Sequence, residues 1–305
     1  MPFEKRIFSL KNLMLVKRVR QILKRESFDA LILNTTLASV ILRLALPKRL
    51  KKITKVINFV HGYLFSGKIR TLRSFLLWLL ECLLRKKTDA VITMNREDEG
   101  LAKRWRLAKR IIKSDGVGAV NRCGFGRERC RGGFVITFVG ELSKRKNQAF
   151  LISCMPSLVR YIPEAALCLA GDGSERRRLL RLAERLSVSG AVFFLGQRED
   201  AQAIMAGCDL YASAAKCEGL PINIIEALSL GKTVLASDIK GHSDLISSGE
   251  NGYLFKPCDK ADFIKRVIEV YRGGYIDPSA AMASVRRYRR TACAEKILKI
   301  LSEVL

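Results

Sequence analysis

Residues 134–147 have the sequence FVITFVGELSKRKN, an almost continuous apolar run followed by a glycine and a basic turn. A short apolar run without polar alternation is typical of a strand that is buried on both faces, as in a parallel sheet. In a doubly wound sheet, the loops after the carboxyl ends of the strands line the ligand crevice. The stretch therefore predicts an α/β domain in which Arg145 and Lys146 face such a crevice.

The same alternation of strands and helices extends in both directions along the 305 residues. Short β-branched runs alternate with helical periodicity, which is the pattern of βαβ units. We expect strands at 29–34, 53–60, 89–94, 134–139, 166–170, 191–195, 210–212 and 233–236, and helices at 147–161, 174–187, 199–206, 222–230 and 259–271.

This pattern predicts two doubly wound, Rossmann-like domains in tandem. The first is expected at 1–125 and the second at 126–275, with a connection rich in Gly, Arg and Cys at 113–133. Apolar residues at helical spacing near the C-terminus predict a helix within 276–305 that packs back toward the first domain.

The stretch 218–226, EGLPINIIE, carries the strongest chemical signal. Gly219 and Pro221 allow a tight turn into a helix, whose N-terminus exposes N–H groups suited to a diphosphate. Glu218 can reach a sugar hydroxyl, and Glu226 can accept hydrogen bonds from a ribose diol. The competing interpretation is a βα turn flanked by two solvated glutamates.

Three further loops follow predicted strands of this domain. Arg145 and Lys146 would neutralise a diphosphate and stabilise it as it leaves, although a solvated basic turn is the alternative. A base or a ribose could rest on the small turns Gly171-Asp-Gly173 and Gly196-Gln-Arg198, each of which is weak evidence by itself.

Residues 134–272 resemble the C-terminal domain of glycosyltransferase family 4, which has the GT-B fold. The matching stretches are FVGELSKRKNQ, LAGDGSERRRL, VFFLGQRED, CDLYASAAKCEGLPINIIEAL, GKTVLASDIKGHSDLI and NGYLF, in family order. In the first half, NFVHGYLF and LLRKKTDAVITMNREDEGLAKR resemble bacterial capsule and exopolysaccharide transferases.

The resemblance implies a retaining transfer of a sugar from a nucleotide sugar, with a UDP-sugar favoured, to a lipid-linked or polysaccharide acceptor. It implies no cofactor and no required metal, and no DxD motif is present. Glu141 stands where the family often has Arg, which shifts more phosphate charge onto Arg145 and Lys146. The catalytic residues implied are His61 and Glu218, whereas His242 is expected to be structural. The donor-binding residues implied are Gly140, Arg145, Lys146, Gly171, Gly196, Gln197, Arg198, Glu218, Gly219, Leu220, Pro221, Ile222 and Glu226.

The first domain is shorter than its counterpart in the family, because the opening strand and glycine loop have no match here. A truncated gene, a partner chain that completes the domain, or a natural minimal form would each explain this. Two other functions therefore stay open. One is an inactive or partner-dependent subunit that binds a nucleotide sugar, and the other is a sugar-nucleotide epimerase of the same fold.

The chain has 55 Lys and Arg against 29 Asp and Glu, a formal net charge of +26. Such a surface attracts nucleic acid, anionic lipid or phosphorylated substrates, but no nucleic-acid recognition motif accompanies it.

Nine cysteines without a CxxC pair predict no zinc site. No signal peptide or long uncharged apolar run is present, so a cytoplasmic protein is expected.

A candidate membrane surface lies within 72–84. Its apolar stripe has basic residues at both ends and would suit the anionic inner face of the plasma membrane, where the protein would be peripheral. The alternative is a helix packed on the sheet. The stripe comprises Leu72, Phe75, Leu76, Leu79, Leu80 and Leu83, widened by Leu77, Trp78 and Leu84, and its basic flanks are Lys68, Arg70, Arg73, Arg85, Lys86 and Lys87.

Overall fold

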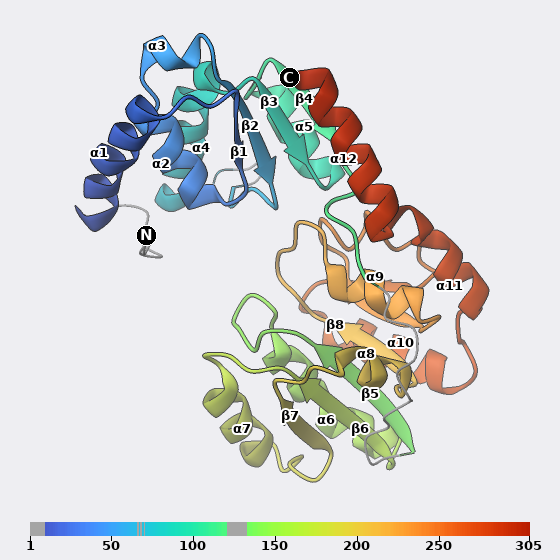
Figure 1. Ribbon diagram of the computed structural model, residues 1–305. Coiled ribbons are helices and arrows are strands. Elements are labelled where there is room, and N and C mark those ends of the chain that lie inside the picture. The colour runs from blue at the N-terminus through green and yellow to red at the C-terminus, as the bar shows by residue number, and fades with distance from the viewer. Residues whose placement is uncertain (1–9, 66, 68, 70, 121–132) are drawn as a thin grey trace. The chain divides into compact units, whose positions relative to one another are not determined.

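The computed structural model describes residues 10–65, 67, 69, 71–120 and 133–305 (Figure 1). The chain divides into two compact units, one formed by residues 1–116 with 293–305 and the other by residues 117–292. Each unit has its own hydrophobic core.

The first unit contains a four-stranded parallel sheet in the order β1-β2-β3-β4. The predicted strands at 29–34, 53–60 and 89–94 are confirmed, whereas β4 was not predicted and ends at Lys113, where the expected connection begins. Helices α1, α2 and α4 group beside β1 and β2, and α5 lies beside β3 and β4 (Figure 1). The elements are α1 (Leu10–Arg25), β1 (Ala30–Leu33), α2 (Thr36–Ala45), α3 (Lys48–Lys51), β2 (Lys55–Val60), α4 (Leu72–Leu84), a 3-10 turn (Arg85–Lys87), β3 (Ala90–Thr93), α5 (Arg96–Arg104) and β4 (Arg110–Lys113).

Helix α4 begins at a capping box formed by Thr71 and Ser74, and it buries a narrow face. That face contains Leu77, Leu84 and Glu81, whose carboxylate accepts two hydrogen bonds from Arg43 of α2 at 2.7 and 2.9 Å. The two charged groups are buried together, so each needs the other as a partner. The ion pair therefore fixes which side of α4 faces the protein.

The predicted apolar stripe on α4 is only partly exposed, because Leu76, Leu79 and Leu80 are partly buried. Leu72 is 75% exposed and Leu83 is 67% exposed, and Phe75 is also exposed. Of its predicted basic flanks, Lys68 and Arg70 lie outside the described residues, and Arg73, Arg85 and Lys86 are exposed. In the part of the chain that the structure describes, no helix is both long and apolar enough to cross a membrane.

The second unit contains a six-stranded parallel sheet in the order β10-β9-β8-β5-β6-β7. From β5 the chain builds outward to β7 and then returns to β8 on the other side of β5. The strand order therefore reverses between β5 and β8, and open α/β sheets bind ligands at such a point. The strands are β5 (Phe134–Val139), β6 (Ala165–Ala170), β7 (Val192–Gly196), β8 (Leu210–Ser213), β9 (Val234–Ser237) and β10 (Tyr253–Phe255).

The helices of this unit confirm the predicted periodicity. They are α6 (Gln148–Tyr161), α7 (Arg176–Arg185), α8 (Ala201–Ala206), α9 (Ile222–Ser229), α10 (Lys260–Tyr271) and α11 (Pro278–Ser284). A core cluster joins their buried faces to both sides of the sheet, and it includes fully buried Phe138, Leu158 and Leu228.

The segment 276–305, in which we predicted a C-terminal helix, contains two helices separated by a short turn. Helix α11 is followed by a 3-10 turn (Arg286–Tyr288) and then by α12 (Arg290–Val304). Arg289 is extended, because Ala119 donates to the carbonyl of Tyr288 at 2.8 Å and accepts from the N–H of Arg290 at 3.2 Å. This backbone pairing removes the helical hydrogen bonds at that point. Farther along α12, Lys296 forms an ion pair with Asp115 at 2.7 Å.

Candidate functional site

The loops after β5 and β8 are attached to each other at the reversal point of the second sheet. The N–H of Lys216 donates to the carbonyl of Arg145 at 2.9 Å, and Asn147 Nδ2 donates to the carbonyl of Ala214 at 3.1 Å. Asn147 has a left-handed backbone (φ 59°), which Asn tolerates better than most residues. These contacts place the basic turn against the segment that leads into α9.

The structure brings together Arg145, Lys146 and Glu218, as the sequence predicts. Arg145 NH1 lies 2.7 Å from Glu218 Oε2, and Lys146 Nζ lies 2.8 Å from Glu218 Oε1. The side chains of Glu218 and Lys146 are only 8% and 12% exposed, whereas Arg145 is half-exposed. Two cations thus share one carboxylate, and the cluster keeps a net positive charge with which it can attract an anion.

Three of the predicted glycines join the carboxyl ends of neighbouring strands. Gly140 donates to the carbonyl of Ala170 at 2.9 Å, and Gly171 donates to the carbonyl of Gly196 at 2.6 Å. Gly171 has φ 135°, and a Cβ there would collide with the carbonyl of Gly140. The close approach of these backbones requires glycine and brings the ends of β5, β6 and β7 together.

The residues after Gly196 make a separate contact. Gln197 is exposed, and Arg198 forms a bidentate ion pair with Asp200 at 2.7 and 2.6 Å. Its guanidinium is thus engaged with its own loop.

Helix α9 begins directly after Pro221, following the tight turn predicted at 219–222. Gly219 and Pro221 are buried, and Leu220 and Ile222 are partly buried. Glu226 lies one turn into α9 and is half-buried, and this burial raises the pKa of its carboxyl group. Gln202 Nε2 donates to Glu226 Oε1 at 3.4 Å, so the Glu226 carboxyl group accepts a hydrogen bond from within its own unit.

Sequence reasoning missed Asn223 and Tyr211, which hold the start of α9. Asn223 Nδ2 donates to the Tyr211 hydroxyl at 2.8 Å and to the carbonyl of Val139 at 3.1 Å. Tyr211 is fully buried, and burial raises its pKa above the ordinary value. The only sequence signal was the position of Asn223 inside the 218–226 motif, because its partners come from β5 and β8.

His61 follows β2 and belongs to the first unit, whereas the other predicted site residues belong to the second. Its side chain is exposed, although partial desolvation lowers the pKa of its imidazole. Within the described residues, no group of three or more His, Cys, Asp or Glu side chains could hold a metal ion.

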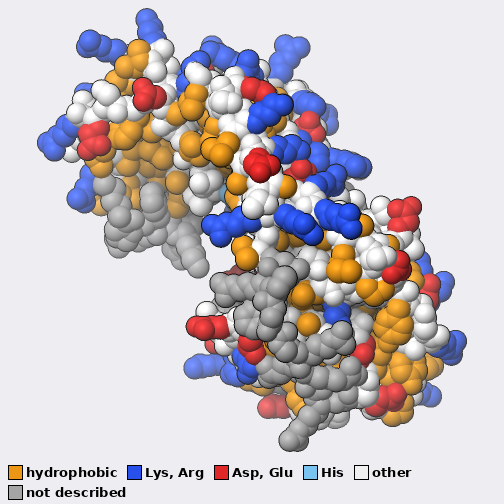
Figure 2. All heavy atoms as spheres, turned by 45° about the vertical axis from the view of Figure 1, so that its right-hand side comes forward, with side chains coloured by type: hydrophobic (Ala, Val, Ile, Leu, Met, Phe, Trp, Pro, Cys, Tyr) orange, Lys and Arg blue, Asp and Glu red, His pale blue; other side chains and the backbone are white. Residues whose placement is uncertain are grey.

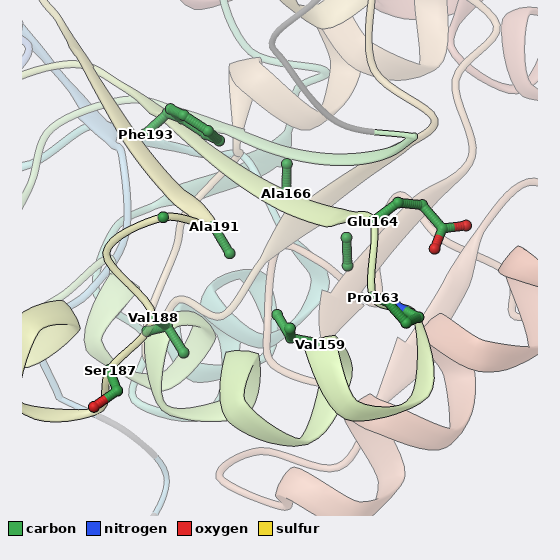
Figure 3. A pocket seen from close by; sticks show the side chains of 10 residues that line it. Val159, Pro163, Glu164, Ala166, Ser187, Val188, Ala191 and Phe193 are labelled. Carbon is green, nitrogen blue, oxygen red and sulfur yellow. The ribbon is translucent and has the colours of Figure 1, made fainter.

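A hollow of about 560 Å³ lies beside the amino ends of β6 and β7, at the other end of the strands from the cluster around Glu218 (Figure 3). Val159 from α6, Ala166 from the start of β6 and Phe193 from the start of β7 line it, so its walls are largely apolar. It lies at the amino ends of these strands, whereas the predicted site residues follow the carboxyl ends. The hollow is therefore separate from the cluster around Glu218.

Comparison with known proteins gives consistent matches. The family Glycosyl transferases group 1 matches residues 129–290. EpsD of Bacillus subtilis, which is named as a glycosyltransferase, is 30% identical over 284 residues, covering 88% of this chain and 74% of EpsD. An Escherichia coli UDP-Gal:alpha-D-GlcNAc-diphosphoundecaprenol alpha-1,3-galactosyltransferase is 25% identical over 283 residues, covering 85% of this chain and 72% of that enzyme.

A solved structure has the same fold. The Anabaena protein HepE, in complex with UDP, superposes with a TM-score of 0.73 at 22% identity, covering 95% of this chain and 82% of HepE. Two parallel sheets with flanking helices, together with these matches, identify the GT-B fold with its Rossmann-like domains. The family match over more than half of the chain and the 30% identity to EpsD show that this chain belongs to the glycosyl transferases group 1 family.

Proposed function

We propose that this chain transfers a sugar from a nucleotide sugar, with a UDP-sugar as the favoured donor, to a lipid-linked or polysaccharide acceptor. The observation that carries the proposal is the pairing of Arg145 and Lys146 with Glu218 at the reversal point of the sheet. HepE was solved with UDP, and the Escherichia coli relative is named for transfer onto a diphosphoundecaprenol-linked sugar. Both support a UDP-linked donor, and the second supports a lipid-linked acceptor.

In this proposal, Arg145 and Lys146 bind the donor diphosphate and stabilise the negative charge that develops on it as it leaves. The bond between the anomeric carbon and the phosphate oxygen breaks, and the acceptor oxygen bonds to the same carbon with retention of configuration. The acceptor proton passes to the departing diphosphate. Glu218 contacts the donor sugar, Glu226 accepts hydrogen bonds from the ribose hydroxyls, and His61 is the second catalytic residue.

We further propose that the protein works as a peripheral protein at the anionic inner face of the plasma membrane. The exposed apolar face of α4 (Leu72, Phe75 and Leu83) with exposed basic residues beside it supports this location. In the face shown in Figure 2, Lys and Arg side chains lie over both units, interspersed with hydrophobic side chains. Apolar insertion and attraction to anionic lipid act together in such a surface.

The test is product analysis with a panel of UDP-sugars and a diphosphoundecaprenol-linked sugar as acceptor, using mass spectrometry and NMR. We expect a glycosylated lipid with the anomeric configuration of the donor, and we expect Lys146→Met to abolish its formation. Lys265→Met, which removes an exposed charge on α10, is the matched control and should keep parental activity.

Two other products would overturn the transferase proposal. A free epimerised sugar nucleotide would show an epimerase. Tight UDP binding without any glycosylated product, across the whole panel of acceptors, would favour a binding subunit.

A further inference from the structure

The turn after β9 packs directly against the backbone of Glu218. Gly241 has φ 82°, and a Cβ there would lie 2.7 Å from the carbonyl oxygen of Gly219 and 3.1 Å from that of Glu218. Only glycine fits this approach, because both the backbone conformation and the space exclude a side chain. The residue that follows, His242, is therefore held at a fixed place behind the Glu218–Gly219 peptide.

The imidazole of His242 is fully buried, and one of its nitrogens is held by Ser237. His242 Nδ1 lies 2.8 Å from the Ser237 carbonyl oxygen and 3.3 Å from Ser237 Oγ. The Ser237 hydroxyl donates to the carbonyl of Ala215 at 2.7 Å, so both Ser237 oxygens offer lone pairs to the ring. This arrangement requires a hydrogen on Nδ1 and leaves Nε2 as a bare acceptor.

Among the described residues, Nε2 of His242 has no hydrogen-bond partner, although the ring is 0% exposed. A buried acceptor without a donor costs free energy, so such atoms are uncommon in native proteins. Glu218 and Lys146 are the charged groups that act on this ring, and burial lowers the pKa of His242 to about 4. The imidazole is thus neutral near pH 7 and adds no charge to the site.

Lys146 is the cation whose charge acts on the His242 ring. Its ammonium carries three hydrogens and forms an ion pair with Glu218 at 2.8 Å. A lysine ammonium on a flexible stem binds phosphate as a point charge, so its position depends on further contacts.

We propose that His242 is a positioning residue for Lys146, whose ammonium donates to His242 Nε2, directly or through one water molecule, when it turns from Glu218 toward a diphosphate. This inference rests on the proposed function, because it needs Lys146 to bind that diphosphate. The neutral ring holds the Lys146 ammonium in place and does not compete with the diphosphate for its positive charge. His242 therefore acts through Lys146 and does not touch the reacting atoms.

Two variants test the roles of the two ring nitrogens of His242 separately. His242→Asn keeps a donor near Nδ1 for Ser237 and removes the acceptor at Nε2. His242→Gln can place its side-chain oxygen near Nε2 and loses the donor to Ser237. Isothermal titration calorimetry with UDP and thermal unfolding are measured on the full chain for both variants and for the parent.

We expect His242→Asn to weaken UDP binding by roughly tenfold, or about 1.4 kcal/mol, because the variant removes an acceptor for a charged donor. Its Tm should stay close to that of the parent. We expect His242→Gln to restore most of the UDP affinity while lowering the Tm. If His242 only filled space, UDP affinity and Tm would fall together in each variant. The opposite effects expected here would then not be seen.

The same measurement in a Lys146→Met chain completes a double-mutant cycle. There, His242→Asn should cause no further loss of UDP affinity, because its partner is already absent. Parental UDP affinity in His242→Asn, or losses of affinity and Tm that run in parallel in both variants, would overturn the role of His242 alone. No UDP binding by the parent chain would overturn the proposed function together with this inference.

Discussion

Glu218 holds the two cations that the proposed diphosphate requires. Its carboxylate lies 2.7 Å from Arg145 and 2.8 Å from Lys146, and it is almost completely buried. A diphosphate that binds these cations must compete with the carboxylate for them. When the diphosphate binds the two cations, the Glu218 carboxylate loses them as partners. It then becomes available to the donor sugar.

This competition predicts opposite effects of one substitution on binding and on transfer. Glu218→Gln removes the competing charge but keeps the shape, so UDP affinity should rise by about threefold to tenfold, consistent with about 1 kcal/mol for such a charge pair. Transfer should be lost, because the contact with the sugar needs the carboxylate. Calorimetry with UDP and product analysis measure the two effects. Weaker UDP binding by Glu218→Gln would show that the carboxylate supports the nucleotide site and does not compete with it.

At the scale of elements, the parallel strands were predictable because their burial on both faces gives continuous apolar runs. The strand predicted at 134–139 has the same bounds as β5. The missed strands are β4, with the sequence RIIK beside a basic segment, and β10, which has only three residues. In short strands, pairing with a neighbour decides the conformation, and a local pattern cannot reveal that neighbour.

Helix α4 shows a second limit of local patterns. Its many leucines allow more than one apolar face, and the buried pair of Arg43 and Glu81 selects the face with Leu77 and Leu84. Since Arg43 lies on α2, that choice depends on a contact between elements. Leu72, Phe75 and Leu83 stay exposed and form the surface that we propose for the membrane.

Substitutions on this exposed face should change membrane binding and leave folding intact. The double variant Leu72→Gln and Leu83→Gln should bind phosphatidylglycerol vesicles about thirtyfold more weakly, because each partly inserted leucine contributes about 1 kcal/mol. Binding by the parent chain should fall as salt rises and should be weak on phosphatidylcholine vesicles. Vesicle co-sedimentation measures both, and Leu298→Gln, at an equally exposed leucine of α12, is the control. Unchanged binding by the double variant would exclude α4 as the contact.

At the scale of the whole molecule, the predicted convergence of the cations on Glu218 depended on one rule, that loops after parallel strands share an edge. The sequence could not place the turn of Gly241 and His242 behind Glu218, because this requires β9 to lie beside β8. It also could not supply the partners of Asn223, which are Tyr211 and Val139. These contacts come from strand order, and strand order is not encoded in any single segment.

The division into two units predicts where a bound nucleotide stabilises the chain. Arg145, Lys146, Glu218 and Glu226 all lie in the second unit, which has its own core. UDP at about one hundred times its Kd should stabilise the bound form by about 2.7 kcal/mol. Hydrogen exchange followed by mass spectrometry should therefore show slower exchange at 140–147 and 214–226, with β1–β4 unchanged.

The Lys146→Met chain provides the control for that experiment, since it should show little protection by UDP at the same concentration. Protection confined to the amino ends of β6 and β7 would instead place the nucleotide in the hollow beside Val159 and Phe193. Equal protection of both sheets would mean that the two units open as one cooperative body, so that stabilising one necessarily stabilises the other. Slower exchange around Glu218 alone would show that the nucleotide site is built from the second unit's own residues.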